Sequence, residues 1–269
     1  MIYEAMLFLS SLVFGLLAML FGMSVAPFFL PFFLVIVGFP LSAAIGGTLV
    51  VKVFVFTTGL LGFVKHGHIS YRLAGQILLL GIPAVIVGVM VSTFISTNVA
   101  LGLMGLMLLI FAGLIIHPEH ELLFRREDTP SKGFVRSEYG IAHNLEIVTS
   151  TLGGLLTGLI GSGAGEINNY VFLKKYRMPG FLAAGTSTFI VAILAVVAVL
   201  GHGVVIFKLE NGLLMQFLAT LAWVVPGAAL GAALGSWFTS RIPDSLRELF
   251  VAALFLAIAV LIVIAALSI

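Results

Sequence analysis

The chain has 269 residues, of which 61% are hydrophobic and only 9% are charged, with a formal net charge of +2 at pH 7. A soluble domain carries roughly a quarter charged residues, so this composition excludes a water-soluble fold and predicts a protein embedded in lipid. The absence of cysteine excludes disulfide frameworks, thiol catalysis and thiolate metal sites. The small net charge offers no basic face to a nucleic acid.

The apolar runs indicate which kind of membrane protein this is. Spanning segments must be helices or a closed barrel, because lipid offers the backbone no hydrogen bonds. These runs are continuous rather than alternating, which predicts helices and excludes a barrel. We therefore expect an all-α, polytopic protein of the inner (plasma) membrane, in contact with lipid.

Glycines, prolines and charged residues divide the chain into ten apolar segments, which we take as the predicted helices. The first has neither a basic stretch before it nor a cleavage site of small residues, so it is expected to be retained rather than removed as a signal peptide. The segments are 4–22, 27–38, 41–64, 71–95, 98–116, 143–161, 166–176, 181–207, 212–238 and 244–268.

One strongly polar stretch, His117 to Tyr139, separates the fifth segment from the sixth. It holds four basic and five acidic residues together with two prolines, a composition typical of a connector. The predicted organisation is a first transmembrane repeat at 1–116, a polar cytoplasmic connector at 117–142 and a second transmembrane repeat at 143–269.

The two halves resemble each other in sequence. Leu16–Pro27 (LLAMLFGMSVAP) aligns without a gap on Leu155–Glu166 (LLTGLIGSGAGE), and the same shift places Pro40 on Pro179. Chance similarity between two apolar sequences is the alternative. The order and spacing of the matches favour an internal repeat.

In each half the second segment is too short to span the membrane. About 12 residues at 1.5 Å each extend roughly 18 Å, well short of the roughly 30 Å hydrocarbon core. The segment is therefore a half-helix, which either completes a broken span or returns to its starting side as a re-entrant hairpin.

The distribution of Lys and Arg selects a topology by the positive-inside rule. If the first two segments of each half leave the chain on its starting side and the N-terminus lies outside, Lys208 alone falls outside and Lys52 lies within a helix. Each half then makes an odd number of net crossings, which predicts inverted repeats, each with about four transmembrane helices plus the half-helix, and both termini outside. The other eleven of the 13 Lys and Arg residues then fall inside: Lys65, Arg72, Arg125, Arg126, Lys132, Arg136, Lys174, Lys175, Arg177, Arg241 and Arg247.

The junction before each half-helix is the predicted binding site. Gly161–Gly165 (GSGAG) is too flexible to continue a helix comfortably, and the next helix is expected to begin at Glu166. Its counterpart, Gly22–Pro27, places a proline where a first helical turn accepts it. The free N–H groups and positive dipole end of a half-helix attract an anion; the alternative is that these glycines only permit close helix packing. The expected contacts are Gly161, Ser162, Gly163, Gly165 and Glu166.

Lys52 lies in the middle of the third segment, where a charge costs roughly 2.5–3.5 kcal/mol on insertion scales. It is expected to face the protein interior and to need an anionic neighbour. That neighbour is either a transported anion or Glu166. A purely structural Lys52–Glu166 pair remains an alternative.

Neutral polar side chains near the junctions are further candidates for contact with a solute. Thr48 and its repeat equivalent Ser187, with the neighbouring Thr186, would offer hydroxyl donors near helix starts. Such hydroxyls often bond to their own backbone one turn back. Asn168 and Asn169, in the first turn of the second half-helix, are expected to face a polar pathway.

The histidines do not form a predicted metal site. The topology places His66 and His68 inside and His202 outside, so we expect interfacial histidines with no special role, and proton coupling is the alternative. No nucleophile–base pair is fixed by spacing around Ser162. The chain is therefore expected not to be an enzyme, with no catalytic residues, no metal and no cofactor.

The motifs described above resemble those of the sulfite exporter TauE/SafE family of membrane transporters. The resemblance rests on Gly161–Gly165 with its short helix, Pro179, and the helix start at Ala183–Ser187, together with Pro226–Gly231 and Arg241–Asp244. It covers nearly the whole chain apart from the connector. The chain departs from the family pattern at its first junction, which lacks the run of glycines, and in carrying Lys52 and Glu166.

The resemblance implies transport, in the export direction, of sulfite or a small organosulfonate such as sulfoacetate. No P-loop occurs in the sequence, so an ion or substrate gradient would drive alternating access around the half-helix N-termini. The expected partners are a small anionic solute and membrane lipid, with a homodimer possible. A non-transporting membrane scaffold or assembly subunit is the alternative function.

Overall fold

The computed structural model describes residues 2–21, 24–116, 143–174, 176, 178–206, 211–239 and 244–268, and within these ranges the chain is helical with no strand. The predicted connector at 117–142 lies outside them. The elements are α1 (Ile2–Phe21), α2 (Ala26–Pro31) continued by the π-helical η1 (Phe32–Ile36), α3 (Leu41–Lys65), α4 (Tyr71–Ser92), α5 (Thr97–Ile116), α6 (His143–Ile160), α7 (Ala164–Lys174), α8 (Gly180–Ile206), α9 (Asn211–Thr239) and α10 (Asp244–Ser268).

The ten predicted segments coincide with these helices, the second being α2 together with η1. Pro27 occupies the first turn of α2, as predicted. The bounds differ from the predicted ones by up to three residues, and one difference concerns the break: α7 begins at Ala164, two residues before Glu166. Helical geometry resumes directly after the turn at Gly163, so Glu166 lies in the first turn of α7 rather than at its first position.

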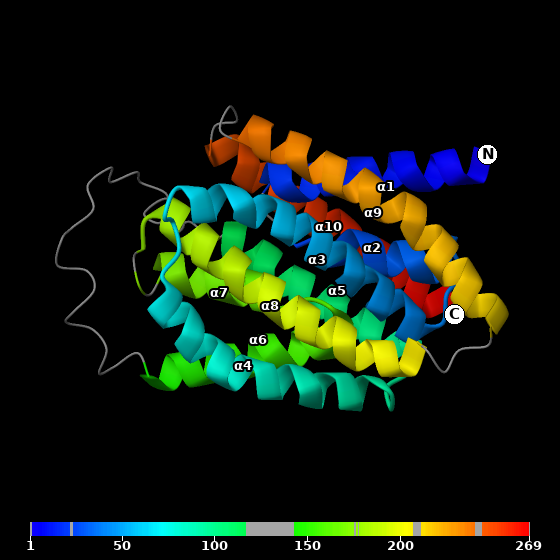
Figure 1. Ribbon diagram of the computed structural model, residues 1–269, viewed down its shortest axis with the longest axis horizontal. Coiled ribbons are helices and arrows are strands. Elements are labelled where there is room, and N and C mark those ends of the chain that lie inside the picture. The colour runs from blue at the N-terminus through cyan, green and yellow to red at the C-terminus, as the bar shows by residue number, and fades with distance from the viewer. Residues whose placement is uncertain are drawn as a thin grey trace.

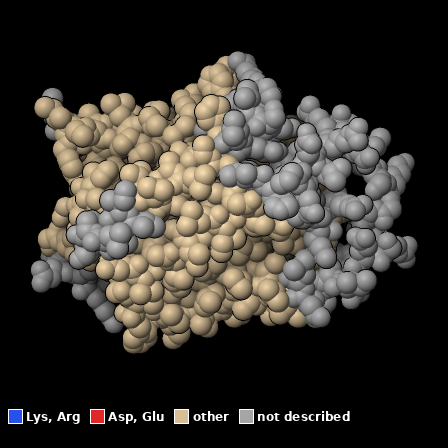
Figure 2. All heavy atoms as spheres, turned by 180° about the vertical axis from the view of Figure 1, so that it is seen from behind, with Lys and Arg blue, Asp and Glu red and all other residues tan. Residues whose placement is uncertain are grey.

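Length and surface composition identify a multi-pass membrane protein. Six of the described helices, α1, α3, α4, α5, α8 and α9, are long and apolar enough to cross a bilayer. Large apolar side chains stand out from the surface, among them Leu79, Leu200 and Leu61. Figure 2 shows one face on which no Lys, Arg, Asp or Glu appears among the described residues. Such a surface fits a lipid environment and not water.

The helices pair across the two halves of the chain. The most extensive packing is that of α1 along α9 and of α4 along α6, followed by α5 on α10 and α3 on α8 (Figure 1). The first helix of each half thus lies against the fourth helix of the other half. The third helices pack on each other, as do the fifth. The halves are interleaved and share one core.

Glycines allow the closest of these pairs to approach. A Cβ added at Gly231 of α9 would collide with the carbonyl oxygen of Leu12 in α1. On the other side of the molecule, a Cβ at Gly158 of α6 would collide with the carbonyl oxygen of Val85 in α4. Small residues at such crossings let the backbones touch, which is how helices associate in lipid.

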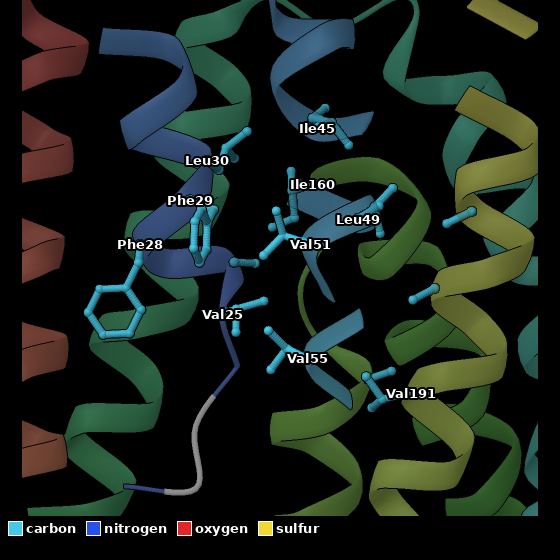
Figure 3. Packing of buried hydrophobic residues seen from close by; sticks show 14 of the residues in the cluster. Val25, Phe28, Phe29, Leu30, Ile45, Leu49, Val51, Val55, Ile160 and Val191 are labelled. Carbon is cyan, nitrogen blue, oxygen red and sulfur yellow. The ribbon is translucent and has the colours of Figure 1, made fainter. Parts of the chain in front are cut away.

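The α1–α2 and α6–α7 breaks border the same buried core. Val25, at the start of α2, and Ile160, at the end of α6, belong to one cluster with Val51 and Val55 of α3. Figure 3 shows these side chains around the middle of α3, with Phe29 of α2 beside them. The middle of α3, which also carries Lys52, is therefore the part of the fold that both breaks border.

Candidate functional site

The break between α6 and α7 is a tight, glycine-dependent turn. Gly161 has φ +76° and Gly163 has φ +128°, conformations that side chains with a Cβ rarely adopt. Ser162 lies between them and is fully buried. The predicted break is therefore present, and its two glycines are required by backbone geometry.

Glu166 caps the helix that follows the break. One oxygen of its carboxylate accepts a hydrogen bond from the Gly163 N–H at 3.1 Å, and the other accepts from Ser162 Oγ at 3.0 Å. This is the reciprocal half of a capping box, in which the third helical residue reaches back to the N-cap. The spacing from Gly163 to Glu166 is a signal that the sequence analysis did not use. The N-terminus of α7, where an anion would bind, is thus already occupied by the carboxylate of Glu166.

Lys52 reaches the break from α3. Among the described residues it is the only Lys, Arg, Asp or Glu in the buried class. Its Nζ donates to the Gly161 carbonyl oxygen at 3.0 Å and lies 5.8 Å from the Phe56 ring centroid. The Glu166 carboxylate interacts with the ammonium electrostatically, but the described residues contain no direct Lys52–Glu166 ion pair. The carbonyl partner was not predicted, because a backbone oxygen leaves no signal in a sequence.

The two repeat-related hydroxyls behave differently. Thr48 Oγ1 donates to Ala44 O in its own helix at 2.8 Å, which is the alternative the sequence left open. The methyl group of Thr48 lies on the side of Gly161. Ser187 Oγ donates to Gly165 O at 3.3 Å and so ties α8 to the first turn of α7.

Thr186 serves another helix. Its Oγ1 accepts a hydrogen bond from the Ser70 N–H at 2.9 Å, at the start of α4. This bond holds the turn before α4 against α8, so the hydroxyl of Thr186 already has a partner outside the break.

Asn168 is the unpartnered polar side chain near the break. It is 1% exposed, and neither its amide nitrogen nor its amide oxygen has a hydrogen-bond partner. In α7, Ala164 packs on Gly153 of α6 and Gly165 packs on Val191 of α8. Helical periodicity places Asn168 one turn later on the face between those two contacts. An amide buried without partners costs free energy, so this side chain is a candidate for contact with a ligand.

Asn169 occupies a different face of α7 and is half-buried. The expectation that both asparagines line one polar pathway remains a prediction.

The prediction for His202 is wrong. This residue lies within α8 and is 1% exposed, rather than at an interface. Its Nε2 is 2.8 Å from the carbonyl oxygen of Gly158 in α6, and its Nδ1 is buried without a partner. The predicted segment 181–207 contains His202, but the sequence did not show that this part of α8 packs on α6. His66 is exposed as expected, and His68 is half-buried with its ring 4.5 Å from that of Phe181.

Comparison with known families decides the class of the protein. Residues 7–262 match the sulfite exporter TauE/SafE family, which is nearly the whole chain. The chain belongs to this family. No curated protein and no solved structure gives a match. The resemblance seen in the sequence is confirmed, and a TauE/SafE protein is a membrane transporter by family.

In this TauE/SafE protein the predicted site residues separate into three groups. Those at the break are Gly161, Ser162, Gly163, Gly165, Glu166 and Lys52, with Thr48 and Ser187 packed against them. Asn168 lies one turn deeper in α7, Thr186 bonds to the start of α4, and Asn169 lies half-buried on another face of α7. The sequence analysis missed Thr157, whose Oγ1 accepts from the Ala164 N–H at 3.3 Å.

Proposed function

We propose that this protein is a secondary transporter that exports a small sulfur oxyanion, sulfite or an organosulfonate such as sulfoacetate. Membership of the TauE/SafE family supports the transport of a sulfur anion. The observation that carries the site is the Glu166 carboxylate, whose two oxygens accept from Ser162 Oγ and the Gly163 N–H. An oxyanion of the solute has the same charge and the same acceptors, so it would bind by displacing that carboxylate.

The surroundings of the carboxylate fit such an exchange. Lys52 supplies a buried positive charge beside the break. The Asn168 amide holds donors with no protein partner. A sulfite or sulfonate group presents three oxygens, so it can accept from the serine hydroxyl, the glycine N–H and an amide at once.

The packing of helices from one half against helices of the other supports alternating access by inverted repeats. Under the sequence alignment α1 corresponds to α6 and α4 to α9, so the α1–α9 pair and the α4–α6 pair are equivalents. Rocking of one half against the other would then slide two matched pairs around the central α3 and α8. Inversion of the repeats and the direction of transport are part of this proposal.

Electrical recordings on proteoliposomes fused to a solid-supported membrane test the function. We expect saturable currents with sulfite or sulfoacetate and none with acetate, which lacks the third oxygen. Taurine, a zwitterion, should give a weaker response than sulfoacetate. A protein that gives no saturable current or binding with any of these sulfur anions is not the transporter proposed.

Glu166→Gln tests the exchange step. The amide keeps an oxygen for the Gly163 N–H but removes the negative charge that competes with the solute. We expect the affinity for sulfite or sulfoacetate to rise about 5-fold, a change of about 1 kcal/mol, measured by calorimetry on purified protein. Glu4→Gln, which removes the same charge at the start of α1, is the control. Unchanged affinity in Glu166→Gln would leave Glu166 as a helix cap and place the solute elsewhere.

A further inference from the structure

The C-terminal end of α6 receives donors from two other helices. The carbonyl oxygen of Gly158 lies 2.8 Å from Nε2 of His202 in α8, and that of Gly161 lies 3.0 Å from Nζ of Lys52 in α3. A carbonyl oxygen only accepts, so Nε2 of His202 must carry the hydrogen. The last carbonyls of a helix form its negative pole. Two side chains from distant parts of the chain have therefore converged on one helix end.

In transporters with broken helices, such an end binds the coupling ion. Freed backbone carbonyls and the C-terminal ends of half-helices coordinate Na⁺ or H⁺ there, while half-helix N-termini hold the anionic solute. In this protein a side-chain ammonium lies against such an end. The ammonium of Lys52 is fully buried and hydrogen-bonded to Gly161 O, and the carboxylate of Glu166 caps the helix that begins just beyond that carbonyl.

We propose that Lys52 is a tethered substitute for a coupling cation, so that the wild-type protein neither binds nor requires Na⁺ at the α6–α7 break. Removal of the side chain then opens a site for a small monovalent cation at Gly161 O and Glu166. The statement about coupling rests on the proposed transport function, whereas the statement about cation binding does not.

The balance of charge at the break explains why a vacated position would take a cation. With Lys52 present, its charge offsets the carboxylate of Glu166, and each pole of the broken helix pair faces a group of opposite sign. Removing the ammonium leaves the Gly161 carbonyl oxygen without its donor and the carboxylate of Glu166 without a positive charge nearby, and both losses destabilise the fold. A mobile cation of the right size should bind and recover part of that loss by linkage.

Two variants with matched salts test the cation site. Lys52→Ala removes the positive charge and also leaves the space of the lysine side chain empty. Lys52→Met removes the charge but fills that space. Thermal stability of the purified full-length protein is measured in NaCl and in choline chloride at equal ionic strength, and with added propylammonium chloride. Lys65→Ala, which removes an exposed lysine from the end of the same helix, is the control.

We expect Na⁺ or propylammonium to raise the melting temperature of Lys52→Ala saturably by about 2–4 °C over choline. Lys52→Met should not respond to propylammonium, because the side chain occupies its space. The melting temperature of wild type should not change from one salt to another, and neither should that of Lys65→Ala. If Lys52→Ala responds no more than Lys65→Ala does, the proposal is overturned.

The wild-type protein supplies an independent test should the variants fail to fold. Its melting temperature and its sulfite or sulfoacetate current are compared in Na⁺ and in choline, and both are expected to be unchanged. Saturable stabilisation or activation of wild type by Na⁺ would overturn the tethered-cation proposal. A lack of current with every sulfur anion would instead defeat the proposed function and leave the melting experiments readable.

Discussion

At the scale of single residues, the polar groups of the break differ in whether the protein already satisfies them. Lys52 donates to the Gly161 carbonyl oxygen and Glu166 accepts from the Gly163 N–H, so both charged groups have a backbone partner within the fold. Asn168, one turn away, has no partner for either end of its amide. Lys52 and Glu166 therefore have a structural role within the fold, whereas Asn168 has none that its contacts show. For this reason Asn168 gives the sharper test of contact with the solute.

Asn168→Leu separates stability from transport. Replacing an unsatisfied amide by an apolar side chain of similar size should raise the free energy of unfolding by about 1 kcal/mol. The same change removes the amide donors from the proposed solute site. We expect a loss of about 1.4 kcal/mol of binding free energy, which corresponds to a sulfite or sulfoacetate current about 10-fold lower. Thermal unfolding and solid-supported-membrane recording measure the two effects.

Asn169→Leu, at the neighbouring half-buried position, is the matched control and should leave the current near that of wild type. If Asn168→Leu destabilises the protein and transport is unaffected, then the amide has a structural partner in another conformation.

At the scale of helices, the contacts that unite the halves depend on backbones that touch. Gly231 on α9 and Gly158 on α6 lie against backbone carbonyls of α1 and α4, where no flexible side chain can move aside. Other helical glycines, such as Gly113 in α5, face open space. The same residue type therefore has a packing role at one position and none at another.

Gly231→Ala and Gly113→Ala test this distinction. The added methyl group at Gly231 forces α9 away from Leu12 of α1, and overpacking of this kind costs about 1–3 kcal/mol. At Gly113 the same methyl group meets nothing, and the higher helix propensity of alanine should leave stability equal or raise it by up to about 1 kcal/mol. Thermal unfolding in detergent compares the two variants. Equal losses would mean that close packing of α1 on α9 does not limit stability.

At the scale of the whole molecule, the proposed inversion of the repeats has a consequence for the two sides of the membrane. The fourth helices, α4 and α9, are repeat equivalents, so their first residues should lie on opposite sides. Tyr71 begins α4, and Gly212 is the second residue of α9; both are exposed. The chain contains no cysteine, so single cysteines can be introduced into the native sequence.

We expect Gly212→Cys to react with a membrane-impermeant maleimide in intact cells. Tyr71→Cys should react only after the cells are permeabilised. Space is open around Gly212, so the substitution itself should not disturb packing. Labelling of both positions from the same side would contradict inverted repeats, and labelling with the sides exchanged would place the termini inside.

Much of this architecture could be predicted from the sequence because it depends on local properties. The existence and approximate bounds of the helices follow from apolar length, and the break at Gly161–Gly163 follows from the freedom of glycine to take positive φ. The family likewise depends on residue patterns that are already present in the unfolded chain. The cap formed by Glu166 is local too, and its spacing from Gly163 was there to be interpreted.

Only the tertiary structure decided which groups meet across helices. Lys52 could have paired with Glu166, but it reaches the Gly161 carbonyl instead, since the crossing of α3 over the break sets what its side chain can touch. His202 was expected at the membrane interface, but it is buried within α8 against the Gly158 carbonyl of α6. Thr186 accepts a hydrogen bond at the start of α4 rather than at the break. A sequence records the donors and acceptors of side chains. The backbone carbonyls that they find are assigned by the packing of helices distant in the chain.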